Sequence, residues 1–309
     1  MLRANYSYLD RYLLTFTGKV DGSSRFAEGQ KYGFLPSATL GWNVAEESVM
    51  RHQKSFSNLK QRVSYGETRN TGINPHTTLG NLNRTKYVFG NTGVYRYSPN
   101  NISNPDLKWQ TTASANIGLD FGLFSSRVSD SLEFYRQNTS DLLIQRRLPQ
   151  TNGTSNVKHQ NIGKTINSRI KLTLSTINIE SKGSFTWTKD ISFSKNKEEI
   201  VALYGDRKDD VGNGWFIGQP LTVFFDYKKT GNWQTNKQAE AVSYGQTVGG
   251  IKVRDRVPVD ANGNITKVQD GKITEDDRIV LGSEVPDWTD GITNRFEYKY
   301  CNHLLFYWY

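Results

Sequence analysis

Two acidic loops near the carboxyl end of the chain contain the residue types that bind calcium. The stretch Asp260–Ile265 follows the pattern D-x-N-x-N, and Asp270–Asp277 holds a second series of carboxylates. Calcium takes oxygen ligands of this kind, but an EF-hand loop needs a glycine at its sixth position, where the first stretch has Ile265. The second stretch has no carboxylates just upstream of Asp270. We interpret both as solvated loops and predict no metal site.

The residues that commonly act as catalytic acids, bases or nucleophiles do not form a recognisable set. The four histidines have no partner at a catalytic or metal-binding spacing: His52, His76, His159 and His303. Neither G-x-S-x-G nor H-E-x-x-H occurs in the chain. Adjacent carboxylates such as Glu46 and Glu47 leave a glycosidase pair open, because the fold sets the separation of the two groups. We predict that the chain is not an enzyme and needs no cofactor.

Four aromatic side chains are the candidates for substrate binding. They fall in stretches that we expect to be exposed loops: Trp215, Phe216, Tyr227 and Trp233. Aromatic faces stack on sugar rings, and nearby amide groups can bind hydroxyls. The structural alternative is that these rings belong to an aromatic girdle. The sequence leaves both interpretations open.

The composition favours an all-β fold over a helical one. Hydrophobic residues make up 36% of the chain and aromatic residues 12%, with 27 glycines and 8 prolines. The mean hydropathy is −0.64, and no apolar run approaches the roughly 18 residues of a transmembrane helix. A β-barrel is compatible with this low value, because its strands meet lipid on one side only.

Charge and cysteine content exclude further classes of protein. The formal charge is +9, but the basic residues are dispersed among acidic ones, so we predict no nucleic-acid partner. The single cysteine, Cys301, excludes an intrachain disulfide framework.

Several segments alternate apolar and polar residues with the period of two that is typical of strands. The clearest are Tyr12–Asp21, Phe34–Val44 and Thr111–Phe121, and Val128–Tyr135 fits the return strand of a hairpin. The same pattern recurs in 170–175, 184–194 and 292–300. The eleven-residue alternation of Thr111–Phe121 matches a tilted membrane-spanning strand, which needs about 9–11 residues.

The segments between these strands differ in length. Gly122–Arg127 is a short turn, whereas Glu67–Tyr97 and Lys228–Thr289 are long and rich in Gly, Asn and Thr. Outer-membrane barrels combine short turns on one side with long loops on the other. Two stretches, Asn43–Glu47 and Lys195–Val201, are predicted to form single helical turns.

Ordered blocks of the sequence resemble the carboxy-terminal half of the SusC/RagA family of TonB-dependent importers of the Bacteroidetes outer membrane. The matching blocks are YLLTFTGKVDGSSRF (12–26), YGFLPSATLGWNV (32–44), NPDLKW (104–109), NIGLDFGL (116–123), FSKNK (193–197), IGQPL with YKKTGNW (217–233), DGKITEDDRIVLG (270–282) and GITN (291–294). Local roles are also expected, with Asp21–Ser24 as a tight turn, Asn104–Pro105 as a turn initiator, and Trp42 and Trp109 in an interfacial girdle.

The resemblance implies an antiparallel transmembrane β-barrel of about 22 strands. Residues 1–309 would form an incomplete portion of that barrel. A plug domain, a signal peptide and the final strands would lie outside this chain. The last residues, Cys301–Tyr309, depart from the family pattern because apolar residues occupy both faces.

The resemblance also implies a function in the bacterial outer membrane. It predicts TonB-dependent import of an oligosaccharide or peptide, with a SusD-like lipoprotein over the barrel mouth and the TonB–ExbB–ExbD complex acting through the plug. The barrel would contact outer-membrane lipid, and this portion alone would not transport. The alternative is a secreted all-β carbohydrate-binding or hydrolytic module, which predicts shorter strands and a sandwich of two sheets.

Overall fold

The computed structural model describes residues 1–147, 157–181, 185–204, 208–256 and 271–308. The chain divides into two compact units, one of Met1–Asp209 with Pro286–Tyr309 and the other of Asp210–Val285.

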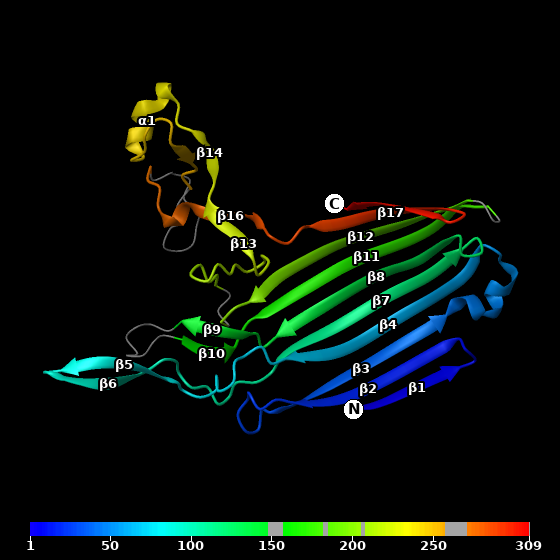
Figure 1. The fold of residues 1–309 in the computed structure, drawn as a ribbon, viewed down its shortest axis with the longest axis horizontal. Helices are drawn as coiled ribbons and strands as arrows, with labels where there is room; N and C mark the ends of the chain where they lie inside the picture. Colours follow the sequence, from blue (N-terminus) through cyan, green and yellow to red (C-terminus); the bar gives the residue numbers. More distant parts are fainter. Residues whose placement is uncertain (148–156, 182–184, 205–207, 257–270, 309) are drawn as a thin grey trace. The chain divides into compact units, whose positions relative to one another are not determined.

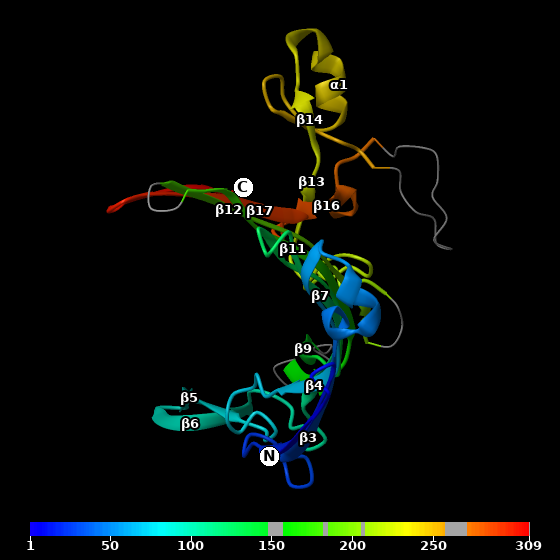
Figure 2. The same cartoon turned by 90° about the vertical axis from the view of Figure 1, so that its right-hand side faces the viewer.

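The first unit is built on a 10-stranded antiparallel sheet, in which the strands follow one another nearly in chain order. Figures 1 and 2 show that the sheet is strongly curved. Its strands are β1 (Leu2–Tyr8), β2 (Tyr12–Gly22), β3 (Tyr32–Asn43), β4 (Phe56–Asn70), β7 (Gln110–Leu123), β8 (Val128–Ser140), β11 (Lys164–Glu180), β12 (Phe185–Ala202), β17 (Trp288–Tyr298) and β18 (Cys301–Trp308).

The strands are much longer than those of most soluble proteins. Strand β11 has 17 residues and β12 has 18, whereas soluble strands usually have about 5–6. Within the described residues of the first unit the other sheets have two strands each, so none could serve as the second layer of a sandwich. The alternative prediction of a sandwich with short strands is therefore wrong.

The connections are short at one end of the sheet and long at the other. Residues 9–11, 124–127 and 299–300 join neighbouring strands at the short end, together with a longer link at 44–55. At the opposite end the connections within the first unit are 23–31, 71–109 and 141–163, of which the last two are long, and the chain leaves the sheet there for the second unit after Ala202. The predicted asymmetry of the connections is confirmed.

The long connections contain regular structure of their own. In the first unit β5 (Leu82–Phe89) pairs with β6 (Thr92–Pro99), and β9 (Leu143–Arg147) pairs with β10 (Val157–Asn161). The link between β3 and β4 holds two 3-10 helices, η1 (Val44–Glu46) and η2 (Ser48–His52). Glu67–Tyr97 is thus not a simple loop, since it includes the end of β4, all of β5 and most of β6.

The second unit consists of small elements. Strand β13 (Val223–Tyr227) pairs with β16 (Arg278–Ser283), and β14 (Lys229–Asn232) pairs with β15 (Ile251–Val253). The helical turns are η4 (Thr235–Lys237), α1 (Gln238–Ser243) and η5 (Glu275–Asp277). The stretch Lys228–Thr289, expected as a loop, is therefore largely a folded unit.

Two predictions of secondary structure are wrong, one for Lys195–Val201 and one for Tyr300. Lys195–Val201 continues β12 and is not a helical turn, because it pairs along its length with β11. The departure of Cys301–Tyr309 from the family pattern stays a prediction; Cys301–Trp308 forms the edge strand β18, all of whose side chains are exposed. Tyr300 lies in the turn before β18, outside the strand that was expected to include it. The helical turn expected within Asn43–Glu47 is confirmed as η1.

Among the described helices, none has both the length and the apolar character that a bilayer crossing requires. The buried hydrophobic cluster of the first unit also lies outside the large sheet. It is formed by Phe26, Ile73, Leu107 and Trp109, with Leu143 packed against it, all from the long connections or β9. Apart from Ile200 near the end of β12, no described hydrophobic side chain of the ten strands is buried.

Candidate functional site

One face of the large sheet carries an apolar band that runs across seven strands. Cross-strand partners align into a row of apolar side chains: Tyr6, Leu14, Leu40, Val63, Ile117, Phe134 and Ile170. Near the middle of this row, Val63 is 42% exposed and Ile117 51%. A row of this length across seven strands is an exposed apolar patch, which marks a surface covered by lipid or by another protein.

An aromatic pair ends this face at the short-turn end of the sheet. The rings of Tyr12 and Trp42 are stacked with their centroids 6.4 Å apart. The Tyr12 hydroxyl donates to a carboxylate oxygen of Glu47 at 2.9 Å, and the Trp42 Nε1–H donates to the same oxygen at 3.1 Å. Arg11 lies 3.4 Å from the other oxygen. Apolar rings with polar tips suit the boundary between hydrocarbon and water.

The donors around Glu47 change its acidity. The Trp42 hydrogen bond, followed by that of Tyr12, holds the pKa of the Glu47 carboxyl below its ordinary 4.5. A carboxyl that stays ionised and is held by three side chains is a poor general acid. The geometry therefore does not favour the glycosidase pair left open for Glu46 and Glu47.

The lowered pKa predicts how this end of the sheet responds to acid. A depressed folded-state pKa stabilises the fold above the unfolded value and loses that stabilisation as pH falls through the folded pKa. Trp42 fluorescence of the detergent-solubilised full-length protein should therefore stay constant down to pH 4.5 and change only below it. A Glu47→Gln variant should lack this transition. A transition above pH 4.5 that Glu47→Gln removes would contradict the assignment.

The opposite face of the sheet is polar and cross-linked between strands. The Arg62 guanidinium donates to both oxygens of Asp120, at 2.8 and 2.7 Å, and to Glu133 at 2.9 Å. Gly118 leaves room for it, because a Cβ there would lie 3.1 Å from Arg62 Nη2. The network spans β4, β7 and β8.

A second polar network lies further along the same face. The Thr173 hydroxyl donates to Asp130 at 2.7 Å, and the Ser175 hydroxyl lies 2.7 Å from an Asp190 oxygen and 3.2 Å from Asp130. Beyond it, Arg169 donates to the Ser194 hydroxyl at 3.0 Å. Such hydroxyls and charges suit a water-filled interior and not a lipid contact.

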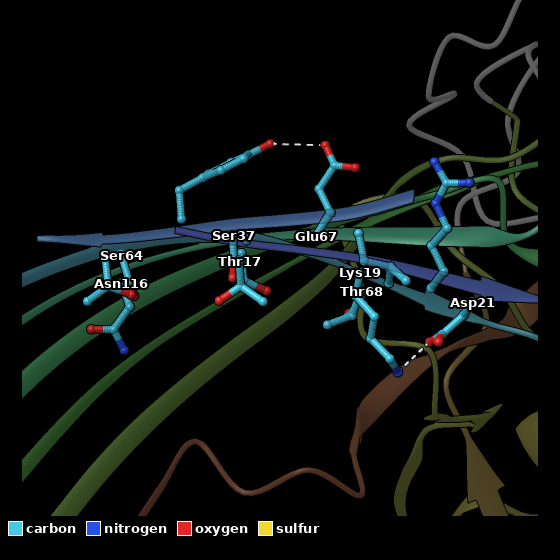
Figure 3. Close-up of a pocket in the computed structure, with 14 residues that line it drawn as sticks. Thr17, Lys19, Asp21, Ser37, Ser64, Glu67, Thr68 and Asn116 are labelled. Carbon is cyan, nitrogen blue, oxygen red and sulfur yellow. Dashed lines mark hydrogen bonds and ion pairs between the residues drawn. The ribbon is translucent and has the colours of Figure 1, made fainter. Parts of the chain in front are cut away.

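A recess of about 580 Å³ opens on strands β2, β3, β4 and β7. Figure 3 shows Thr17, Ser37, Ser64 and Asn116 on the polar side of the sheet, whereas Glu67 projects from the other side. Hydroxyls and an amide line this side, and they can bind a hydroxyl-rich or peptide ligand equally well. The recess therefore fits a polar solute without specifying one.

Two of the four aromatics proposed for substrate binding are buried in the second unit. Trp233 is 3% exposed, with the Lys252 ammonium 4.2 Å from its ring centroid and its Nε1–H donating to Gln246. Phe216 is 9% exposed and packs against Phe225 at 4.6 Å. The expectation that these two rings are exposed is wrong. Both Trp233 and Phe216 are part of the small hydrophobic interior of the second unit.

The other two proposed aromatics are partly exposed. Trp215 pairs through its backbone with Asp210, and Tyr227 ends strand β13. Phe216 lies against Phe225, whereas Trp233 lies against Tyr244, so the four rings do not form one aromatic platform. Their role in ligand binding stays a prediction.

The NPDLKW block anchors the long connections to one another. Trp109 is 7% exposed, stacks on Phe26 with centroids 5.4 Å apart and donates its Nε1–H to the Gln30 carbonyl at 2.9 Å. Leu107 is fully buried, and the Asn104 side chain donates to the His159 carbonyl at 2.7 Å. Trp109 is therefore a core residue of the loops, and its predicted place in an aromatic girdle is wrong.

Asn161 connects the NPDLKW block to the residue after strand β8 through hydrogen bonds to the backbone. Its side-chain NH₂ donates to the carbonyls of Lys108 and Asp141 at 2.6 and 3.1 Å, and its oxygen accepts the Lys108 backbone N–H at 2.8 Å. No sequence pattern pointed to this residue. The only sequence signal for an ordered structure in this region was the NPDLKW block at residues 104–109.

The first calcium-like loop, Asp260–Ile265, and Asp270 lie outside the described residues. In the second stretch Asp277 is buried and accepts backbone N–H groups of Thr274 and Arg256, both at 2.6 Å. It therefore caps η5 and holds a neighbouring segment. Among the described residues no group of three or more His, Cys, Asp or Glu side chains could hold a metal ion.

Comparison with known families gives a match to a family model. Residues 1–289 match the family described as "TonB dependent receptor-like, beta-barrel". The chain is 36% identical over 311 residues to TonB-dependent receptor P26 of Formosa agariphila, covering 96% of this chain and 30% of that protein. It is 31% identical over 304 residues to TonB-dependent receptor SusC of Bacteroides thetaiotaomicron, covering 96% and 29%. The chain thus spans about a third of the length of these relatives.

The fold is similar to that of solved structures. The structure of the RagAB peptide transporter aligns with a TM-score of 0.81 at 24% identity, covering 99% of this chain and 32% of that one. At this identity the match concerns the fold alone. The alignment superposes the curved antiparallel sheet of this chain on about one third of the longer chain of the peptide transporter.

Proposed function

The chain belongs to the family of TonB dependent receptor-like β-barrels of the bacterial outer membrane, and from this membership we propose that it forms part of the barrel of a SusC-like nutrient importer. We assign residues 1–309 to that barrel domain. The apolar face is the surface that contacts outer-membrane lipid. The polar face lines the path of the solute.

The observation that carries the proposal is the division of the sheet into two faces. The row through Val63 and Ile117 is exposed and apolar, while Arg62, Asp120 and Glu133 form a charged network on the other side. A soluble protein would bury the first face, and a transmembrane barrel exposes it to lipid. The long connections then lie on the extracellular side, since outer-membrane barrels place short turns in the periplasm.

The substrate and partners follow from the relatives as proposals. The cargo is an oligosaccharide or a peptide, captured beneath a SusD-like lipoprotein that sits over the long connections. Import uses the TonB–ExbB–ExbD complex, which acts on a plug in the part of the longer relatives that this chain does not match. Named relatives are receptors, in keeping with transport rather than catalysis.

The proposal predicts energy-dependent uptake. Cells that lose the gene containing this sequence should no longer accumulate a fluorescent oligosaccharide or casein-derived peptide that the parent strain imports. Deletion of exbB should abolish the same uptake, while the barrel should remain in the outer-membrane fraction of a density gradient. Recovery of the protein in the culture medium, or uptake that persists without exbB, would contradict the proposal.

A further inference from the structure

The hairpin β5–β6 lacks the packing that usually stabilises a two-stranded ribbon. All side chains of 82–99 in its two strands are exposed except Ser98. Figure 1 shows the hairpin, in cyan, extending beyond the end of the large sheet. An isolated two-stranded hairpin is at best marginally stable in water. An exposed hairpin of this kind would be stabilised by a bound ligand or partner.

The base of the hairpin is held firmly. The Asn101 side chain accepts the Asn81 backbone N–H at 2.6 Å and donates to the Leu79 carbonyl at 3.3 Å. The Asn100 N–H donates to the Asn81 carbonyl at 2.7 Å, and the Asn83 amide donates to the Asn100 side chain at 3.0 Å. The hairpin is therefore presented in a defined direction.

The register sorts the hairpin side chains onto two different faces. Arg84 is opposite Tyr97 and Lys86 is opposite Tyr95, so two cations and two tyrosines share one face. The Arg84 guanidinium lies 3.9 Å from the centroid of the Tyr95 ring, which holds the cation in place. The other face carries Tyr87, Phe89, Val94 and Arg96, with a single cation.

The charge of the hairpin is uncompensated. Residues 82–99 include Arg84, Lys86 and Arg96 and no Asp or Glu. Within the described part of the chain none of these three cations forms an ion pair, which is also true of many other lysines and arginines; what distinguishes the hairpin is that residues 82–99 carry three cations and no acid. The missing negative charge points to an anionic ligand.

We propose that the Arg84–Tyr97 face of the hairpin is a capture site for an anionic oligosaccharide at the cell surface. Exposed tyrosine faces can stack on sugar rings, as apolar platforms do in ligand sites. The Arg84 guanidinium binds a carboxylate or sulfate in a bidentate manner, and Lys86 adds a second charge. The inference rests on the proposed function, because it places the hairpin on the extracellular side and narrows the cargo to acidic saccharides.

The two faces supply a matched test in the full-length, detergent-solubilised protein. Oligogalacturonate binding, measured by calorimetry at low salt, should weaken about ten-fold or more in Arg84→Gln/Lys86→Gln, because two charge-assisted contacts are lost. Arg96→Gln, on the opposite face, should bind within about two-fold of the parent. Tyr97→Ala should weaken binding, and Tyr87→Ala should not. Neutral malto-oligosaccharide should bind no variant measurably.

Other outcomes would overturn the inference. Equal losses in Arg84→Gln/Lys86→Gln and Arg96→Gln would mean non-specific charge attraction, and equal binding of polyglutamate would mean an acidic peptide or protein partner. Binding of lipopolysaccharide micelles, with no binding of oligogalacturonate, would assign the face to the membrane surface. Failure of this site leaves the uptake test of the proposed function unaffected, since that test uses the unmodified protein.

Discussion

Replacing Ile117 by arginine should destabilise the assembled barrel by about 2–4 kcal/mol, the cost of a cation near the middle of a lipid-facing strand. Ile117 is near the centre of β7, is 51% exposed and has Val63 and Phe134 as its cross-strand neighbours. The measurement is urea unfolding of the full-length protein in lipid vesicles. The amount of heat-modifiable protein in outer-membrane fractions should fall in parallel.

The adjacent residue supplies the control. Asn116 belongs to the polar face and lines the recess, so Asn116→Arg should be tolerated with little change in stability. Ile117→Val preserves the apolar surface and should also be mild. Equal destabilisation by both arginine variants would mean that the two faces do not differ in environment, and the assignment of lipid and solute faces would fail.

Replacing Trp109 by alanine should loosen the long connections at a cost of about 3–5 kcal/mol, the usual range for removing a buried tryptophan. Its ring is 7% exposed and stacks on Phe26, and its N–H reaches the Gln30 carbonyl. The Trp109 ring packs against residues of the long connections and not against the large sheet. Intact cells should therefore keep the barrel in the membrane while trypsin gains access to Arg25, Lys31 and Lys108.

Two further variants sharpen this test. Trp109→Phe retains a ring against Phe26 and loses only the hydrogen bond to Gln30, so it should cost about 1 kcal/mol. Trp42→Phe changes the partly exposed aromatic at the other end of the sheet and should leave trypsin access to the loops unchanged. If Trp109→Ala removed the protein from the outer membrane altogether, the loops and the sheet would not be separable in stability.

The strands that the sequence predicted are those in which alternation is uninterrupted. Tyr12–Asp21 and Thr111–Phe121 correspond to β2 and β7 within one or two residues. Strand β4 was not predicted, because polar residues interrupt the apolar side of the strand. Gln61 and Glu67 lie on the same side as Leu59, Val63 and Tyr65. Near the rim of a barrel, polar residues are tolerated on this face, so period two fades toward strand ends.

The side-chain environments were harder to predict than the strands. Trp42 and Trp109 both stand near strand ends, yet one is 37% exposed beside Glu47 and the other 7% exposed against Phe26. The difference depends on a contact between residues 79 positions apart, Trp109 and Gln30. Local spacing contains no information about such a contact. The same holds for Trp233, whose cover comes from Lys252 and Gln246.

The order of strands in the sheet follows the order of the chain, and the excursions 71–109 and 203–287 leave and return between neighbours that still pair in register. For a flexible segment, doubling its length raises the entropy cost of closure by only about 0.6 kcal/mol. The rim can therefore gain, lose or exchange whole folded insertions while the strand registers stay as they are. Under the proposed function, such a barrel can acquire a new cargo specificity by recombination at the cell surface, without rebuilding its membrane-spanning strands.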